Sequence, residues 1–245
     1  MKFTIKLADK IICVDSLYES TLTFLNNYLT DSNELDFCVE VSGDDISNER
    51  QKYIHEAQTE NLPIINFSDN YLETLALYRK IVSKMSFYNT LLFHGSVVAV
   101  DDIGFLFTAK SGTGKSTHTK IWRNYFGERA VMINDDKPLI SVGEDDVTVY
   151  GTPWDGKHHL SSNTSVPLKA ICILERGEQN IIERISVDEA YPMFLQQTYK
   201  PTSSIELMNT LDILDRLMNK VNIYRLKCNM EKEAAIVAYN GMKGD

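Results

Sequence analysis

Residues 109–116, Ala-Lys-Ser-Gly-Thr-Gly-Lys-Ser, are the stretch that decides the fold. They have the spacing of a Walker A phosphate-binding loop, with Ala109 in place of the usual first glycine. Gly112 and Gly114 let the backbone turn so that several N–H groups face a phosphate. Lys115 is placed to reach the β- and γ-phosphates, and the Ser116 hydroxyl is placed to bind Mg²⁺. The stretch therefore predicts a site for a nucleoside triphosphate.

The sequence on both sides of the loop has the character that such a loop requires. An apolar run at 103–108 precedes it and predicts a strand, while residues 116–126 predict a helix that Gly127 ends. The N-terminus of that helix would point at the bound anion. The ligand is expected to be ATP with Mg²⁺, held by Ser111, Gly112, Thr113, Gly114, Lys115, Ser116 and Thr117.

A pair of carboxylates, Asp135 and Asp136, follows a short apolar strand at 130–133. In a P-loop sheet such a strand normally lies beside the strand of the loop, so its carboxylates face the Mg²⁺ and the phosphates. Adjacent residues of an extended chain point to opposite sides. One carboxylate can then bind the metal while the other faces an acceptor. The alternative is a solvated acidic turn before Pro138.

His94 lies inside a long apolar run at 91–100, which with 103–108 predicts an antiparallel hairpin around Asp101-Asp102. The glycine after His94 indicates a close approach of backbone. A functional histidine and a satisfied core histidine are both compatible with this pattern.

A long loop at 152–166 contains aromatic, basic and imidazole side chains and has little periodicity. Loops of this length are often functional. We expect residues 152–162 to form a mobile lid that decides the choice of acceptor through Trp154, Lys157 and His158. The alternative is an ordinary loop with Trp154 packed on the body of the protein. His158 and His159 are adjacent, so a metal site made of both is not expected.

The patterns along the chain predict a mixed α/β fold with a boundary between residues 68 and 69. Residues 1–68 form a small N-terminal α/β segment, with strands at 3–7, 11–14 and 35–41, a polar helix within 45–58, and an edge strand or loop at 61–67. Residues 69–245 form the P-loop domain. Several hairpins indicate that its β-sheet is mixed rather than purely parallel.

The remaining elements of the second domain follow from periodicity, turn residues and capping residues. We expect a helix at 69–88, hairpins at 139–142 with 147–150 and at 168–175 with 181–185, helices after the capping boxes Ser186–Glu189 and Ser203–Glu206, a strand at 222–227 and a helix at 231–239. Pro192 should kink or shorten the first of the capped helices.

The amino-acid composition limits the classes of binding partner to expect. A formal net charge of −9 argues against a nucleic acid or an anionic membrane, because both attract basic surfaces. The four cysteines are too far apart in sequence for a zinc knuckle or a redox pair. No leader peptide is recognised, and no apolar run approaches the ~18 residues that span a bilayer. The expected location is the cytoplasm, and homo-oligomerisation is left open.

The combination of His94-Gly95, residues 111–116 and Asp135-Asp136 resembles the catalytic domain of HPr kinase/phosphorylase, a fold related to phosphoenolpyruvate carboxykinase. The chain also looks like the uncharacterised HPr-kinase-related proteins. The resemblance covers about residues 90–185. It implies that Lys115 and Ser116 contact phosphate and metal, that Asp135 is the catalytic base with His94 beside it, and that Asp136 lies near the metal. The arginine–glycine stretch that closes the site on HPr is not recognised here.

These features together predict an ATP-dependent phosphotransferase that moves the γ-phosphate to a hydroxyl of a peptide, a protein or a small molecule. One alternative is a carboxykinase reaction on oxaloacetate, which needs a second metal and arginines for the carboxylates; arginine is sparse near the motifs. The other is a regulatory module that binds ATP without turnover.

Overall fold

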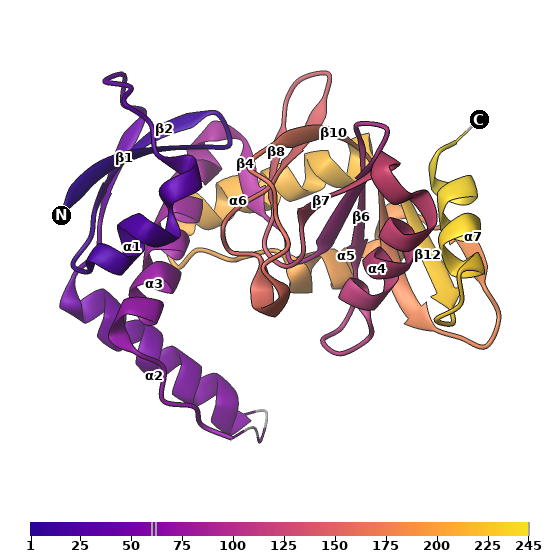
Figure 1. Ribbon diagram of the computed structural model, residues 1–245, viewed down its shortest axis with the longest axis horizontal. Helices are drawn as coiled ribbons and strands as arrows, with labels where there is room; N and C mark the ends of the chain where they lie inside the picture. Colours follow the sequence, from indigo (N-terminus) through magenta and orange to yellow (C-terminus); the bar gives the residue numbers. More distant parts are fainter. Residues whose placement is uncertain (60, 62, 245) are drawn as a thin grey trace. The chain divides into compact units, whose positions relative to one another are not determined.

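The computed structural model describes residues 1–59, 61 and 63–244 of the chain, which divides into two compact units. The first unit is Met1–Lys84, and the second begins at Met85. The division falls later than the predicted boundary at 68/69, so the helix α3 (Asp69–Met85) belongs almost entirely to the first unit. Figure 1 shows the elements of both units.

The N-terminal unit has a three-stranded sheet. Strands β1 (Lys2–Leu7) and β2 (Lys10–Asp15) form an antiparallel hairpin, and β3 (Phe37–Glu40) pairs in parallel with β2. All three strands are confirmed, as are the helices α2 (Gly43–Thr59) and α3. The described residues of 61–67 form a loop rather than an edge strand; residue 62 lies outside the described residues. A short helix α1 (Glu19–Phe24) and a 3₁₀ turn η1 (Asn26–Tyr28) complete this unit.

The second unit is built on a mixed sheet that has nine strands in the described part of the chain. Its main path runs in the order β4-β8-β9-β10-β6-β5-β7, and β12 and β11 continue from β10. Strands β6, β10 and β12 are parallel, and the other neighbours are antiparallel. The strands are β4 (Thr90–Leu92), β5 (Ser96–Val100), β6 (Ile103–Thr108), β7 (Ala130–Asn134), β8 (Leu139–Val142), β9 (Val147–Tyr150), β10 (Ser165–Arg176), β11 (Ile181–Arg184) and β12 (Asn222–Cys228).

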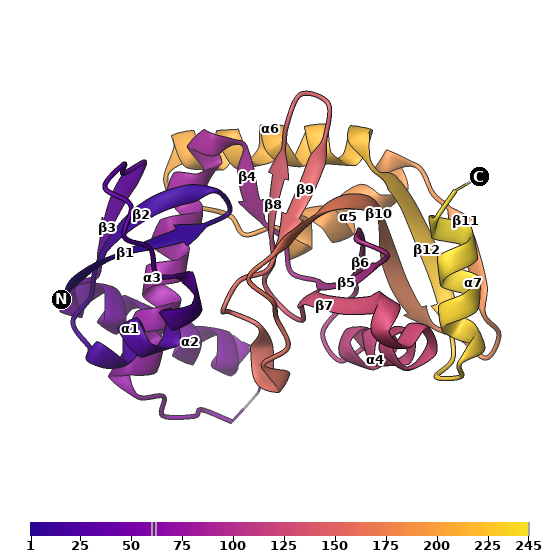
Figure 2. The ribbon, with the colours of Figure 1, turned by 45° about the horizontal axis from the view of Figure 1, so that its top comes forward.

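Helices cover both faces of this sheet (Figure 2). Strand β6 shows why, because its alternate residues point to opposite faces. Phe105 and Phe107 pack with Trp122 in the core under α4 (Lys115–Phe126) and α7 (Glu233–Met242). Leu106 belongs to the other core, under α5 (Val187–Gln197) and α6 (Ser204–Lys220). The glycine loop thus leaves a strand that is buried on both faces. Three 3₁₀ turns complete the unit: η2 (Ser86–Tyr88), η3 (Gly127–Arg129) and η4 (Gly156–His158).

The predicted hairpin between 168–175 and 181–185 is wrong. Strand β11 pairs with β12, and β12 lies between β11 and β10. The reason is burial, since Ile223 and Leu226 of β12 are buried whereas β11 is largely exposed. The more apolar strand therefore takes the central position although it comes later in the chain.

The capping predictions have different outcomes. The Ser186–Glu189 box is formed, and α5 continues through Pro192 to Gln197. Ser203 precedes α6, but its side chain makes no capping hydrogen bond, so the second box is wrong. The hairpins β5–β6 and β8–β9 and the last strand and helix are confirmed.

The apolar run at 91–100 is not one strand. It breaks between β4 and β5, where the His94 N–H donates to the Gln197 carbonyl and the Gly95 N–H donates to the Asp136 carbonyl. A Cβ at Gly95 would lie 2.8 Å from Leu106 Cδ2, so only glycine fits without displacement. The predicted close approach is real, and it leaves His94 at a strand break instead of inside a strand.

Candidate functional site

The glycine loop joins the end of β6 to the start of α4, in the strand–loop–helix order that the sequence predicts. Gly112 and Gly114 have φ angles of +75° and +122°, which side chains rarely allow. Ala109 is fully buried in the core beneath α4, so a small residue suits the first position. Helix α4 opens with a hydrogen bond from the His118 N–H to the Gly114 carbonyl, 2.9 Å long.

Lys115 connects the loop to the carboxylates electrostatically. Its Nζ donates to the Ala109 carbonyl at 3.4 Å, so the amine lies over the loop that it follows. Burial lowers the pKa of Lys115, and the nearby charges of Asp136 and Asp135 oppose that shift. The amine is therefore within the field of both carboxylates.

Asp135 is held by a buried hydrogen-bond network. Strand β7 pairs with β5 rather than with β6, so the expectation that it lies beside the strand of the loop is wrong. The β5–β6 hairpin places β5 between them, and Ser96 of β5 spans the gap. Ser96 Oγ donates to Asp135 Oδ1 at 2.5 Å and lies 3.1 Å from Thr119 Oγ1 on α4. Asp135, 6% exposed, is thereby linked to the helix that follows the loop.

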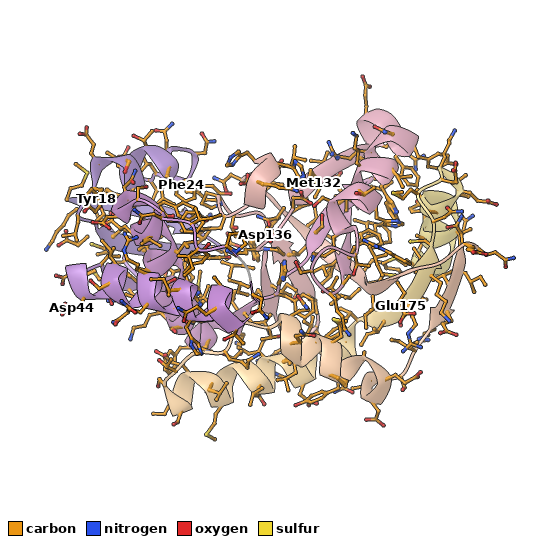
Figure 3. The ribbon with its side chains drawn as sticks, turned by 90° about the horizontal axis from the view of Figure 1, so that it is seen from below. Tyr18, Phe24, Asp44, Met132, Asp136 and Glu175 are labelled. Carbon is orange, nitrogen blue, oxygen red and sulfur yellow. The ribbon has the colours of Figure 1, made fainter. Side chains whose placement is uncertain are left out.

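Asp136, labelled in Figure 3, is the partner of His94. His94 Nε2 lies 3.1 Å from Asp136 Oδ1, and Lys137 Nζ lies 3.8 Å from Oδ2. Burial raises the pKa of Asp136. The His94 hydrogen bond and the charges of Lys137, His94 and Lys115 lower it by more, so the pKa lies below its ordinary value. The contact pairs His94 with Asp136, whereas the resemblance implied that His94 stands beside Asp135.

Asn134 is a site residue that the sequence reasoning missed. It is fully buried, and its Oδ1 accepts the N–H groups of Asp136 and Lys137 at 2.9 and 2.7 Å. Its Nδ2 donates to the carbonyl and the hydroxyl of Thr152 at 2.9 and 3.0 Å. It therefore fixes the turn that carries the carboxylates and joins that turn to the next loop. The available signal is an asparagine directly before the turn, because its side chain can accept from the backbone N–H two residues later.

The loop before β10 passes directly against Asp136. A Cβ at Gly156 would lie 3.1 Å from Asp136 Cβ. Trp154 is 5% exposed, so it packs on the body of the unit, as the alternative reading held, and is not offered to an acceptor. Lys157 and His158 are exposed on the η4 turn beside Gly156. The loop thus has a buried anchor and a basic exposed tip close to the His94–Asp136 pair.

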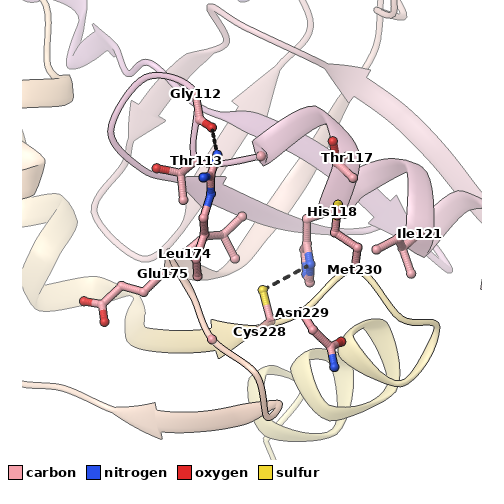
Figure 4. Close-up of a pocket in the computed structure, with 13 residues that line it drawn as sticks. Gly112, Thr113, Thr117, His118, Ile121, Leu174, Glu175, Cys228, Asn229 and Met230 are labelled. Atoms are coloured by element: carbon pink, nitrogen blue, oxygen red, sulfur yellow. Dashed lines mark hydrogen bonds between the residues drawn. The ribbon is translucent and has the colours of Figure 1, made fainter.

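A cavity of about 510 Å³ adjoins Gly112, Thr113 and Gly114 of the glycine loop (Figure 4). Arg176 lies at its edge and donates from Nη2 to the Gly112 carbonyl at 2.7 Å. The walls come from the loop, from α4 and from the ends of β10 and β12: Gly112, Thr113, Gly114, Thr117, His118, Ile121, Leu174, Glu175, Arg176, Gly177, Cys228, Asn229 and Met230. Sequence reasoning missed this cavity because its walls come from segments far apart in the chain.

The described residues contain no group of three or more His, Cys, Asp or Glu side chains that could hold a metal ion by themselves. The Ser116 hydroxyl and one carboxylate fit Mg²⁺ all the same, since Mg²⁺ is usually bound by one or two protein oxygens together with phosphate and water. Among these residues, no helix is long and apolar enough to cross a membrane.

Comparison with known proteins finds distant likeness among solved structures only. No protein-family model matches the chain, and no curated protein matches it. Among solved structures, the chain is similar to the Hpr(Ser) kinase/phosphatase from Coxiella burnetii, with 12% sequence identity and a TM-score of 0.32. The match covers 62% of this chain and 99% of that one. A likeness at this level carries no argument about the site, and the roles of the site residues rest on their own geometry.

Proposed function

We propose that the chain is an ATP-dependent phosphotransferase that moves the γ-phosphate to a hydroxyl acceptor. One observation carries the proposal: Lys115 lies over a glycine turn at the start of a helix and within the field of Asp135 and Asp136. Backbone N–H groups, a lysine and two carboxylates are the parts that phosphoryl transfer requires. Catalysis would come from positioning and charge neutralisation.

Phosphate binding would use the loop with little rearrangement. The ammonium group of Lys115 has three donors and makes a long hydrogen bond to Ala109. A phosphate in the loop would replace that carbonyl with a charge-assisted partner. The helix α4 N-terminus favours the same anion. Ser116, in the first turn of α4, would supply a ligand to Mg²⁺.

The geometry favours an exchange of the roles first expected for the two carboxylates. Asp135 is tied through Ser96 to Thr119 on α4, the helix that carries Ser116, so Asp135 suits the metal. Asp136 is paired with His94, whose side chain is 37% exposed and can pass a proton to solvent. A hydroxyl acceptor needs a proton acceptor within hydrogen-bond reach. Asp136 with His94 therefore suits the acceptor side.

The acceptor would approach over the loop tip at Lys157 and His158, which lies beside Asp136. The acceptor class is a hydroxyl of a peptide, a protein or a small molecule. Trp154 would support the loop from below.

The test compares two lysines of the same loop. Binding of ATP and Mg²⁺ is titrated by calorimetry in the wild type, in Lys115→Ala, and in Lys110→Ala as a control with an exposed lysine. We expect an affinity loss of about 10- to 100-fold for Lys115→Ala, from the loss of a charged hydrogen bond, and little change for Lys110→Ala. Unchanged binding in Lys115→Ala would overturn the site. ADP release is then followed with a panel of hydroxyl acceptors; binding without turnover on any of them would indicate a regulatory module.

A further inference from the structure

The cavity beside the glycine loop contains a chain of three polar side chains that phosphate binding does not use. The chain begins at Trp122 on α4, passes through His118 one turn earlier, and ends at Cys228, the last residue of β12. His118 and Cys228 both line the cavity (Figure 4). These contacts fix the direction in which hydrogens are donated.

The first link sets the tautomer of His118. Trp122 Nε1 lies 3.0 Å from His118 Nε2, and an indole N–H can only donate, so Nε2 accepts. Burial lowers the pKa of His118 to about 4, so the ring is neutral at neutral pH. A neutral imidazole that accepts at Nε2 bears its hydrogen on Nδ1. Nδ1 lies 4.0 Å from Cys228 Sγ, so the ring donates weakly toward the sulfur.

The contact between His118 and Cys228 leaves the Cys228 S–H available as a donor to the cavity. Burial raises the pKa of the Cys228 thiol, so the group keeps its hydrogen at neutral pH. Because the sulfur faces a donor on its His118 side, its S–H is directed elsewhere, and Cys228 forms part of the cavity wall. A ligand with a hydrogen-bond acceptor would meet that S–H.

The other walls indicate what kind of ligand fits. Ile121, Leu174 and Met230 are apolar. The Asn229 amide holds its own loop, because Nδ2 donates to the Glu178 carbonyl and Oδ1 accepts the Glu231 N–H. The phosphate loop forms one edge of the cavity, next to Glu175 and Arg176 at the end of β10. A suitable ligand therefore has phosphate at one end and a flat apolar ring with acceptor atoms at the other. About 510 Å³ is within the range of small-ligand sites.

We propose that this cavity binds the purine base of the nucleotide, and that Cys228, oriented by His118 and Trp122, is a specificity-determining residue that donates to a ring nitrogen of the base. The inference rests on the proposed function, because phosphates on the loop would bring the base to the cavity. It adds the place where the base would bind and the residue that would recognise it.

The first experiment separates base from phosphate. Binding of ATP, CTP and inorganic tripolyphosphate, each with Mg²⁺, is measured by calorimetry on the full chain. We expect ATP to bind at least about tenfold more tightly than either of the others, since a buried ring and one hydrogen bond distinguish it. Equal binding of ATP and tripolyphosphate would overturn the base site and leave the phosphate loop standing. Equal binding of ATP and CTP would overturn the preference for a purine, and binding of none of the three would overturn both proposals.

The second experiment tests Cys228 itself. Cys228→Ala should weaken ATP about three- to tenfold, the range for one hydrogen bond, and leave tripolyphosphate unchanged. Cys228→Ser keeps a donor of similar size and should restore most of the loss. An Ala variant that binds ATP like the wild type, or that weakens both ligands equally, would overturn the role of Cys228.

A labelling experiment adds a readout that does not need a substitution in the cavity. In a chain with Cys13→Ser and Cys38→Ser, the remaining thiols are Cys228 and the fully buried Cys172. ATP should slow alkylation of Cys228 several-fold, as seen by mass spectrometry, and tripolyphosphate should not. Equal protection by both compounds, or by neither, would contradict a base seated against this thiol.

Discussion

The two sides of the proposed site are built in different ways. The phosphate side is a backbone turn: Gly112 is exposed and a Cβ there would meet no atom within 4 Å. The carboxylate side is a buried network, in which Ser96 and Asn134 are fully buried and each makes side-chain hydrogen bonds to residues distant in the sequence. The difference teaches that the phosphate side depends on conformation, whereas the carboxylate side depends on particular side chains.

The largest effect is expected on the carboxylate side, at Asp136. Asp136→Asn removes the proposed proton acceptor and keeps the shape, so it should retain ATP binding and lose transfer by about 10²–10⁴-fold, as for a general base. Asp135→Asn is the matched variant and should chiefly weaken the dependence of ATP binding on Mg²⁺. Single-turnover rates and metal titrations on both variants test this. The opposite result, with transfer lost in Asp135→Asn alone, would restore the roles first expected from the sequence.

The next largest effect is expected at Asn134, where a substitution tests whether side-chain hydrogen bonds hold the turn at Asp135 and Asp136. Asn134→Ala removes the side chain that accepts from the N–H groups of Asp136 and Lys137 and donates to the Thr152 carbonyl. We expect a loss of about 2–3 kcal/mol in the free energy of unfolding, the penalty for unsatisfied buried groups. Urea unfolding measures it. As a control, Asn124→Ala at an exposed position of α4 should change stability little, and a loss as small in Asn134→Ala would show that the network does not hold the turn.

A smaller effect is expected for Gly112→Ala on the phosphate side. The new methyl group has space, so the expected penalty of about 1–2 kcal/mol comes only from the left-handed backbone at φ +75°. ATP affinity should fall several-fold, and the melting temperature should fall by only about 2–8 °C, as a penalty of that size implies. Gly43→Ala, where space is also open but φ is not positive, is the control. A large fall in the melting temperature would mean that the loop is held by packing.

The same contrast explains what could be predicted from the sequence. The glycine loop could be predicted, because its residues are contiguous and their spacing reflects one local conformation. The pairing of His94 with Asp136, the place of β12 inside the sheet, and the roles of Ser96 and Asn134 depend on segments that meet only after folding. Trp154 shows how a local sequence pattern can also mislead. An aromatic residue in a long loop indicated a contact for the acceptor, but Trp154 is buried, because burial of its large apolar surface is favourable.

The smallest predicted effect sharpens the account of the His94–Asp136 pair. The pKa of Asp136 is below its ordinary value, and the His94 hydrogen bond is the foremost of the interactions that lower it. A carboxylate with a lowered pKa stays ionised until the pH falls through that value. Activity that needs the ionised form of Asp136 is then present above the pKa and is lost below it.

His94→Ala removes the hydrogen bond to Asp136, so the pKa of Asp136 should rise and the acid limb of the kcat/KM profile should move to higher pH. The limb should stay in place in His158→Ala, whose imidazole is exposed on the nearby η4 turn. An acid limb unmoved in His94→Ala, with Asp136→Asn still inactive, would mean that His94 holds the strand break rather than the charge of the base.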